Sequence, residues 1–322
     1  VAGDLTLARA EELVRRLHKL ANPEFKAVSL AQFWSDWLDE QKRHVVASTV
    51  NGYKNDYDLF ADALGARIMD APISSVTTKQ ISVALEKAQK QGNGKGKSTR
   101  RASTINKALA TLRRVMEDAV AKRLVTHNPA KQCRSLSQQD STQRAPFTAK
   151  EVREMIGHPD TSDEWQGAIT LAAHTGLRLG DIVNLSEKHL DVARLVIMPS
   201  KTSKQKKVIT VPLTPPCLAW VKGRKGDYFP TLKKQETATC SMQFSAIMSR
   251  AKVPKTVELP GGFTASRSFH SLRHTFASWL ADADIHADVR QKLTGHSSSK
   301  IHAQYSHHDE ALDRAIGTLP EL

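Results

Sequence analysis

A polar stretch without apolar periodicity divides the chain into two unlike halves. Residues 131–146 (KQCRSLSQQDSTQRAP) are rich in Gln and Ser and show no spacing typical of a helix or a strand. We therefore expect a linker here, with one domain on each side. The full length of 322 residues leaves each domain enough chain to bury a core of its own.

The half before this linker is predicted to be all helical. Apolar residues recur at helical spacing over four segments, 29–42, 48–64, 77–91 and 100–123. Ser and Thr side chains accept hydrogen bonds from the free amides of a first helical turn. The expected N-caps of this kind are Ser48-Thr49 and Thr77-Thr78. We expect one helical domain over residues 28–130.

A separate amphipathic helix is predicted ahead of that domain. Leucines recur at roughly helical spacing within residues 4–21. The sequence starts at Val1 rather than Met, so we expect residues 1–27 to connect the helical domain to a segment that has been removed.

Basic residues gather in one part of the helical half. The chain has a net charge of +14, and between residues 95 and 134 only Glu117 and Asp118 oppose eleven Lys and Arg. Phosphate contacts supply most of the non-specific affinity for DNA, so this stretch indicates a surface that follows a DNA backbone. A solvated basic helix is an equally fitting interpretation. The candidate backbone-contacting residues are Lys95, Lys97, Arg100, Arg101, Lys107, Arg113 and Arg114.

The second half mixes helices with a small amount of strand. Thr148 and Glu151 have the spacing of a capping box at its start. The β-branched runs 194–199 and 207–212, joined by a Lys-rich turn, predict a β-hairpin. Helices are expected at 164–175, 214–222, 239–251, 269–282, 286–293 and 298–305. The predicted fold is mainly α with a small β-hairpin or sheet, an all-helical domain followed by a mixed α+β domain.

The composition excludes several classes of protein. No apolar run approaches the roughly 20 residues that span a bilayer, and no secretory signal is visible. The cysteines Cys133, Cys217 and Cys240 are scattered without a CxxC spacing, which argues against a disulfide framework and a zinc cluster. We expect a cytoplasmic, globular chain that uses no cofactor and no metal.

Five signals with chemical meaning follow one another in the second half. They are Thr175-Gly176-Leu177-Arg178 with Asp181, Lys201 in the hairpin, His270-Ser271-Leu272-Arg273-His274, Gly295-His296, and Tyr305. Taken one at a time, each has an ordinary interpretation: a helix end, a solvated turn, a surface helix or a packing tyrosine. Their joint occurrence in this order, after a basic helical half, indicates a common site.

Transfer of a phosphodiester needs cations and an activated nucleophile. Negative charge gathers on the non-bridging oxygens in the transition state, and the planar guanidinium groups of Arg178 and Arg273 can bind these oxygens in pairs. His270 lies three residues before Arg273, which puts both on one face of a helix. A phenol has a pKa near ~10, so the attack of Tyr305 would need help from His270 or His296.

Two further residues have supporting roles. A hairpin Lys can give a proton to the leaving sugar hydroxyl. Lys201 is the first candidate, with Lys204, Lys206 and Lys207 as rivals. Asp181 lies three residues after Arg178 and can hold an Arg or His in place.

With these residues, the second half closely resembles the catalytic domain of the tyrosine recombinases, also called phage integrases. The resemblance covers roughly residues 148–309, and the helical half resembles the family's core-binding domain less specifically. The matching positions are Arg178 after T-G-L, the acidic Asp181, the hairpin Lys201, the HxxR pair His270 and Arg273, the second His296, and Tyr305 nine positions later, followed by His307. Thr294 stands where the family often has an apolar residue.

The resemblance implies a mechanism and partners. The core-binding domain and a catalytic domain over residues 147–308 would close as a C-shaped clamp around DNA. Tyr305 would form a 3′-phosphotyrosyl link, without ATP or a metal. The implied partners are double-stranded DNA recombination sites, further copies of the chain in a tetramer, and accessory DNA-bending or directionality proteins. The tail 309–322 would pack against a neighbouring protomer or within its own chain.

The opening helix is similar to the segment that follows the arm-binding domain in integrases of prophages and genomic islands. This implies the integration or excision of such an element by a bacterial, nucleoid-associated protein. A type IB topoisomerase and a non-catalytic architectural DNA-binding protein are the alternative functions. A zinc site at His296, His302, His307 and His308 is a further alternative, although the spacing is poor for ligands.

Overall fold

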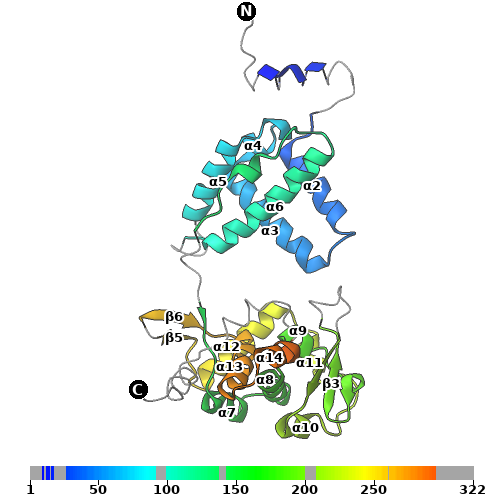
Figure 1. The fold of residues 1–322 in the computed structure, drawn as a ribbon, viewed down its shortest axis with the longest axis vertical. Coiled ribbons are helices and arrows are strands. Elements are labelled where there is room, and N and C mark those ends of the chain that lie inside the picture. Colours follow the sequence, from blue (N-terminus) through cyan, green and yellow to red (C-terminus); the bar gives the residue numbers. More distant parts are fainter. Residues whose placement is uncertain are drawn as a thin grey trace, which may run out of the picture. The chain divides into compact units, whose positions relative to one another are not determined.

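The computed structural model places most of the chain in two compact units (Figure 1). The described residues are 9, 10, 12–14, 16, 17, 27–91, 99–137, 143–199, 208–259 and 261–294. The units comprise residues 1–141 and 142–322, so the boundary falls inside the segment predicted as a linker. The described residues between 9 and 17 have a helical backbone, within the segment predicted as a connector helix.

The first unit is a group of helices around one apolar core. Its elements are α2 (Leu30–Gln41), α3 (Ala47–Leu64), α4 (Ala66–Met69), α5 (Thr78–Lys90), α6 (Ala102–Ala121) and the 3₁₀ turns η1 (Ile73–Ser75) and η2 (Pro129–Gln132). Helix α3 packs against α5 and α6, and Trp34, Phe60 and Leu109 are fully buried in the core. The four predicted helices are confirmed, each within two residues of its expected ends.

One of the two predicted N-caps is confirmed. The Gln80 N–H donates to Thr77 Oγ1, and the Thr77 N–H donates to Gln80 Oε1, which completes a capping box before α5. The prediction of Ser48-Thr49 is wrong because α3 begins at Ala47, and the Val46 carbonyl already accepts the amide of Thr49. Ser48 and Thr49 therefore lie inside the first turn.

The predicted linker, residues 131–146, extends too far at both ends, because the residues there belong to the two units. Lys131 and Gln132 belong to the turn η2, and Cys133 is buried in the core of the first unit. Gln143 and Arg144 form the strand β1 of the second unit. Apolar periodicity does not reveal either end. A side chain of α6 holds the first end, and the second is a strand of two exposed residues.

The second unit surrounds one buried helix, α8 (Asp163–Thr175). Its neighbours are α7 (Ala149–Gly157), α10 (Pro215–Val221) and α13 (His270–Asp282). Every residue of α8 from Gly167 to Ala173 is buried, as expected for a helix that is apolar all round. The other helices are α9 (Leu179–Ile182), α11 (Pro230–Lys233), α12 (Thr237–Arg250), α14 (Ala287–Thr294) and the 3₁₀ turn η3 (Glu187–His189).

Two small sheets complete this unit. The predicted hairpin is confirmed as β3 (Arg194–Ile197) and β4 (Ile209–Pro212), antiparallel, with β2 (Leu190–Asp191) on the far side of β3. The other sheet has the order β1 (Gln143–Arg144), β6 (Phe263–Ser266), β5 (Thr256–Leu259), with β1 parallel to β6. The β5–β6 hairpin was not predicted from the sequence, although Gly261-Gly262 between the strands is a turn signal.

Some of the remaining predictions for this unit concern described residues, and others lie outside them. The capping box of Thr148 and Glu151 before α7 is confirmed, as are the predicted helices that correspond to α8, α10, α12, α13 and α14. The predicted helix 298–305 and the tail 309–322 lie outside the described residues. Among the helices that the structure describes, none is both long and apolar enough to cross a membrane.

Candidate active site

The end of α8 positions the first candidate arginine. Gly176 ends the helix in the left-handed conformation, at φ 66°, and its N–H donates to the Ala172 carbonyl at 3.0 Å. A glycine in this conformation is a common C-cap, and the helix predicted over residues 164–175 ends here. The chain then turns, so that Arg178 stands at the N-cap of α9 with its side chain 27% exposed. Arg178 Nη1 lies 4.0 Å from Oδ2 of the buried Asp181, the position predicted for a supporting carboxylate.

The start of α13 carries the HxxR pair. His270 is the first residue of the helix and is half-buried, and Arg273 follows one turn later with 2% exposure. The rings of His270 and His274 meet edge to face, with their centroids 5.4 Å apart. The same face of the helix therefore presents an imidazole and a guanidinium, as the spacing predicts.

A hydrogen bond joins these two parts of the chain. Arg273 Nη1 donates to the Gly176 carbonyl at 2.7 Å. The Phe276 ring covers the same glycine so closely that a Cβ there would lie 2.5 Å from its Cδ1. Because Arg178 follows Gly176 by two residues, this contact places Arg273 against the loop that carries the other predicted phosphate-binding arginine. Two cations on neighbouring segments can together stabilise charge on a phosphoryl group.

Three predicted site residues lie outside the described part of the chain. They are Lys201, His296 and Tyr305, together with the histidines of the zinc alternative, His302, His307 and His308. The structure places the elements next to two of them. Strands β3 and β4 flank the stretch 200–207 that contains Lys201, and α14 ends at Thr294, two residues before His296.

The DNA-backbone candidates of the first unit differ in their surroundings. Arg101, Lys107 and Arg114 are exposed, and Arg100 is half-buried. The Lys107 amine lies over α3, where it is 3.3 Å from the position of a Cβ on Gly52. Arg114 Nη1 donates to the Tyr53 hydroxyl at 2.7 Å. Lys95 and Lys97 lie outside the described residues.

Arg113 has a structural role that was not predicted from the sequence. Its Nε donates to the Ala130 carbonyl at 3.0 Å, and its Nη2 donates to the Cys133 carbonyl at 2.6 Å. These bonds fasten the turn η2 to α6. No sequence pattern distinguishes Arg113 from its exposed neighbour Arg114, because the partners of Arg113 are backbone carbonyls.

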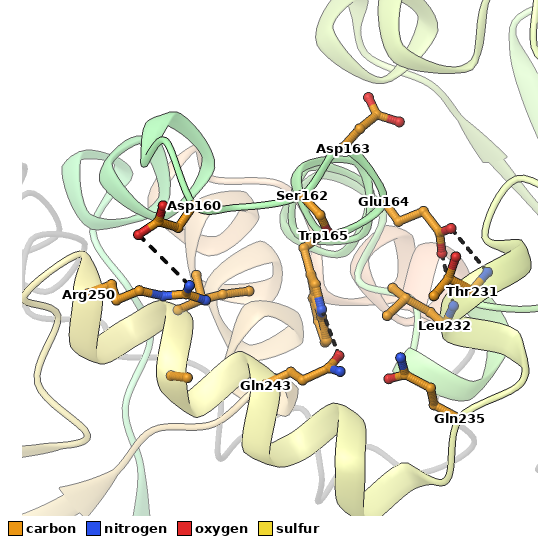
Figure 2. Close-up of a pocket in the computed structure, with 12 residues that line it drawn as sticks. Asp160, Ser162, Asp163, Glu164, Trp165, Thr231, Leu232, Gln235, Gln243 and Arg250 are labelled. Atoms are coloured by element: carbon orange, nitrogen blue, oxygen red, sulfur yellow. Dashed lines mark hydrogen bonds and ion pairs between the residues drawn. The ribbon is translucent and has the colours of Figure 1, made fainter.

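The pocket in Figure 2 is separate from this site. It has a volume of about 570 Å³ and is lined by α8, α11 and α12, where Trp165 Nε1 donates to Gln243 Oε1 and Glu164 accepts the amides of Thr231 and Leu232. It opens at the N-terminal end of α8, whereas Arg178 follows the C-terminal end. A helix of 13 residues is roughly 20 Å long, so the pocket lies about one helix length from the arginines.

Comparisons with known proteins match the chain to phage integrases and tyrosine recombinases. The model of the phage integrase family matches residues 146–311, more than half of the chain. The tyrosine recombinase XerC of Chlamydia pneumoniae is 22% identical over 254 residues, which cover 74% of this chain and 76% of that protein. The integrase of Enterobacteria phage 434 is 25% identical over 282 residues, 84% of this chain and 74% of that protein.

Solved structures share the fold. A lambda integrase dimer bound to a COC′ core site matches with a TM-score of 0.69 at 20% identity, over 94% of this chain and 83% of that one. A lambda integrase tetramer bound to a Holliday junction matches with a TM-score of 0.65 at 19% identity, over 94% of this chain and 87% of that one.

Proposed function

The chain belongs to the phage integrase family of site-specific tyrosine recombinases, and from this membership we propose that it cleaves and rejoins DNA through a covalent link to Tyr305. The Tyr305 hydroxyl gives up its proton, and its oxygen attacks the scissile phosphate. The bond from phosphorus to the 5′ oxygen breaks, which leaves a 3′-phosphotyrosyl link and a 5′-hydroxyl. The 5′-hydroxyl of a partner strand reverses the step. Rejoining needs no ATP because the link keeps the energy of the phosphodiester.

The other site residues act on the charges of this reaction. Arg178 and Arg273 bind the non-bridging oxygens as negative charge grows on them. Lys201 gives a proton to the leaving 5′ oxygen, and His270 and His296 assist the proton transfer and the placement of the phosphate. Asp181 holds Arg178 in place.

One observation carries this assignment. The hydrogen bond from Arg273 Nη1 to the Gly176 carbonyl, at 2.7 Å, ties the HxxR helix to the T-G-L-R loop across 97 residues of sequence. A buried arginine needs hydrogen-bond partners, and a carbonyl of the loop that carries the second arginine supplies one here.

The partners follow from the same family relation. The matched lambda integrase structures are a dimer bound to a COC′ core site and a tetramer bound to a Holliday junction. For this chain we propose double-stranded recombination sites, a tetramer on DNA, and closure of the two units around the duplex as a clamp. The relation to the integrase of phage 434 supports a role in integrating or excising a prophage or genomic island, with accessory DNA-bending or directionality proteins.

The experiment uses a suicide duplex. The core site is the one that the protein selects from a pool of random-sequence duplexes, and a nick just 3′ of the scissile phosphate lets the fragment with the 5′-hydroxyl diffuse away. Covalent adduct is expected with the wild type and absent with Tyr305→Phe. Tyr228→Phe is the control, because the Tyr228 hydroxyl is buried and has no hydrogen-bond partner among the described residues. An adduct that survives Tyr305→Phe would refute the proposal.

A further inference from the structure

The first described residues of the second unit run along the segment that leads into α13. Gln143 and Arg144 pair in parallel with Ala265 and Ser266, and the Ala145 N–H donates to the Ser266 carbonyl at 3.3 Å. Arg144 Nη1 donates to Ser268 Oγ at 3.1 Å, two residues before His270. Residues 143–151, called the N-terminal segment of the second unit, therefore lie against the residues that precede α13.

A second contact of the N-terminal segment lies within α13 itself. The Phe147 N–H donates to Thr275 Oγ1 at 2.8 Å, and this hydroxyl donates to the Ser271 carbonyl at 2.9 Å. Ser271 and Thr275 are fully buried. They flank Arg273 on either side in the sequence, so the first two turns of the helix are held from the N-terminal segment.

The strongest contact between the two segments is an ion pair. Arg267 Nη1 lies 2.7 Å from Glu151 Oε1, with side-chain exposures of 8% and 19%. The Arg267 guanidinium also lies 5.2 Å from the centre of the Phe147 ring. The other carboxylate oxygen of Glu151 accepts the Thr148 N–H at 2.8 Å, in the capping box of α7. Glu151 is therefore held in the cap of α7, and Arg267 directly follows strand β6.

The charge of Glu151 persists in this enclosed place. Burial raises the pKa of Glu151, but the hydrogen bond from the Thr148 amide and the hydrogen bond and charge of Arg267 outweigh it and lower the pKa below its usual value. The pair is therefore ionised at neutral pH, and a charged hydrogen bond of this length restricts the position of both side chains.

We propose that Glu151 and Arg267 are positioning residues for the strand-transfer reaction, which fix the start of α13 so that His270 and Arg273 meet the scissile phosphate. The proposal rests on the proposed function, because it names residues that act through the HxxR pair. Arg267 precedes His270 by three residues, so a shift of its backbone moves the imidazole directly. A displacement of about 1 Å can cost a reaction on the order of a hundredfold in rate.

The test separates DNA binding from the chemical step. Glu151→Gln keeps an acceptor for the Thr148 amide, and with it the capping box, but removes the charge that pairs with Arg267. The matched control is Glu154→Gln on the same helix, whose exposed carboxylate lies 3.9 Å from Lys150 and takes no part in the contact with α13. Arg267→Lys retains the charge, and Arg267→Met removes it.

Two quantities are measured for each variant with the selected suicide duplex. They are the Kd of the duplex and the single-turnover rate of adduct formation at saturating duplex. Glu151→Gln is expected to keep the Kd within about twofold and to lower the rate by about tenfold or more. Glu154→Gln should leave both within about twofold. Arg267→Lys should retain more of the rate than Arg267→Met, because a charged partner for Glu151 remains.

The outcomes distinguish this inference from the proposed function. If the wild type forms no adduct, or if Tyr305→Phe forms one, the proposed function fails. If the Tyr305 results hold and Glu151→Gln forms adduct as fast as Glu154→Gln, the positioning role alone is overturned. A parallel loss of duplex affinity and rate in the Glu151 and Arg267 variants also overturns it, because the pair would then serve only the stability of the unit.

Discussion

At the scale of single residues, the two candidate arginines differ in how far the fold depends on them. The Arg178 side chain is 27% exposed and makes a long contact with Asp181, at 4.0 Å. Arg273 is buried and donates to a backbone carbonyl. Both serve the same chemistry in the proposed mechanism, so their substitutions should differ in stability more than in activity.

Alanine substitutions test this difference. Arg178→Ala should lower the rate of adduct formation by about 10²-fold or more, while the free energy of unfolding stays within about 0.5 kcal/mol of wild type. Arg273→Ala should lower the rate at least as much and also cost about 1–3 kcal/mol, because the Gly176 carbonyl loses its donor. Suicide-duplex kinetics and urea unfolding measure the two effects. Equal losses of unfolding free energy in the two variants would contradict the view that the fold depends on Arg273 more than on Arg178.

Gly176 provides a second prediction at this scale. Its φ of 66° and the nearby Phe276 ring leave no room for a Cβ, so Gly176→Ala should lower the free energy of unfolding by about 1–3 kcal/mol. Gly180→Ala is the control, because nothing lies within 4 Å of a Cβ there and the residue is helical. Urea unfolding should show no loss for this control. A Gly176→Ala variant as stable as wild type would refute the close packing.

Some of these residue properties could be predicted from the sequence and others could not. The C-cap at Gly176 follows from a glycine at the end of an apolar helical run. The burial of Arg273 could not be predicted, because arginine is rarely buried and its partner is a carbonyl 97 residues away. The same holds for Arg267 and Glu151, whose pairing depends on the tertiary fold.

At the scale of secondary-structure elements, α6 combines a core face, a structural arginine and an exposed basic face. Lys107→Ala should weaken DNA binding and reduce the salt slope of log Kd by about 1, with no change in the free energy of unfolding. Arg113→Ala should instead lower this free energy by about 1–3 kcal/mol, because two carbonyls of the segment after α6 lose their donor. Binding titrations at several salt concentrations and urea unfolding separate the two. A loss of stability in Lys107→Ala, or an unchanged free energy of unfolding in Arg113→Ala, would contradict these two roles.

The contact between α8 and α13 makes stability depend on pH. Burial beside Trp279 lowers the pKa of His174 below its usual 6.5. The unfolded chain takes up this proton near pH 6.5 and the folded chain only at lower pH. The stability that neutral His174 contributes is therefore complete above about pH 6.5 and is lost as the pH falls toward the lowered pKa.

Unfolding measurements can isolate this contribution. The free energy of unfolding of His174→Gln should fall less than that of wild type as the pH drops from about 7 to about 5. Identical slopes for the two proteins would show that His174 does not titrate in this way.

The elements themselves were predicted where periodicity is strong. Helices such as α3 and α6 carry an apolar stripe over many residues, so their predicted ends fall within two residues of the observed ones. The strands β5 and β6 were missed because each has four residues, and Ala265 is the only one of the eight that is buried. The strand β1 has two exposed residues and depends on β6 for its hydrogen bonds, which no local pattern records.

At the scale of the whole molecule, the fold brings together segments with proposed catalytic residues that lie far apart in the sequence. The T-G-L-R loop and the HxxR helix, α13, meet through the Gly176 carbonyl. Both lie in the second unit, whose first described residues also contact the start of α13. The net charge of +14 and the basic face of α6 suit a polyanionic partner. Family membership and this local geometry converge on a single reaction, the transfer of a DNA strand to a tyrosine.

The most direct test of that reaction identifies the residue that carries the DNA. The adduct formed with the suicide duplex is digested with nuclease and trypsin, and the modified peptide is sequenced by mass spectrometry. Cleavage after Lys300 and Arg314 gives a peptide over residues 301–314 in which Tyr305 is the one tyrosine. We expect a nucleotide linked through its 3′-phosphate to Tyr305. A nucleotide on any other residue, or on none, would contradict it.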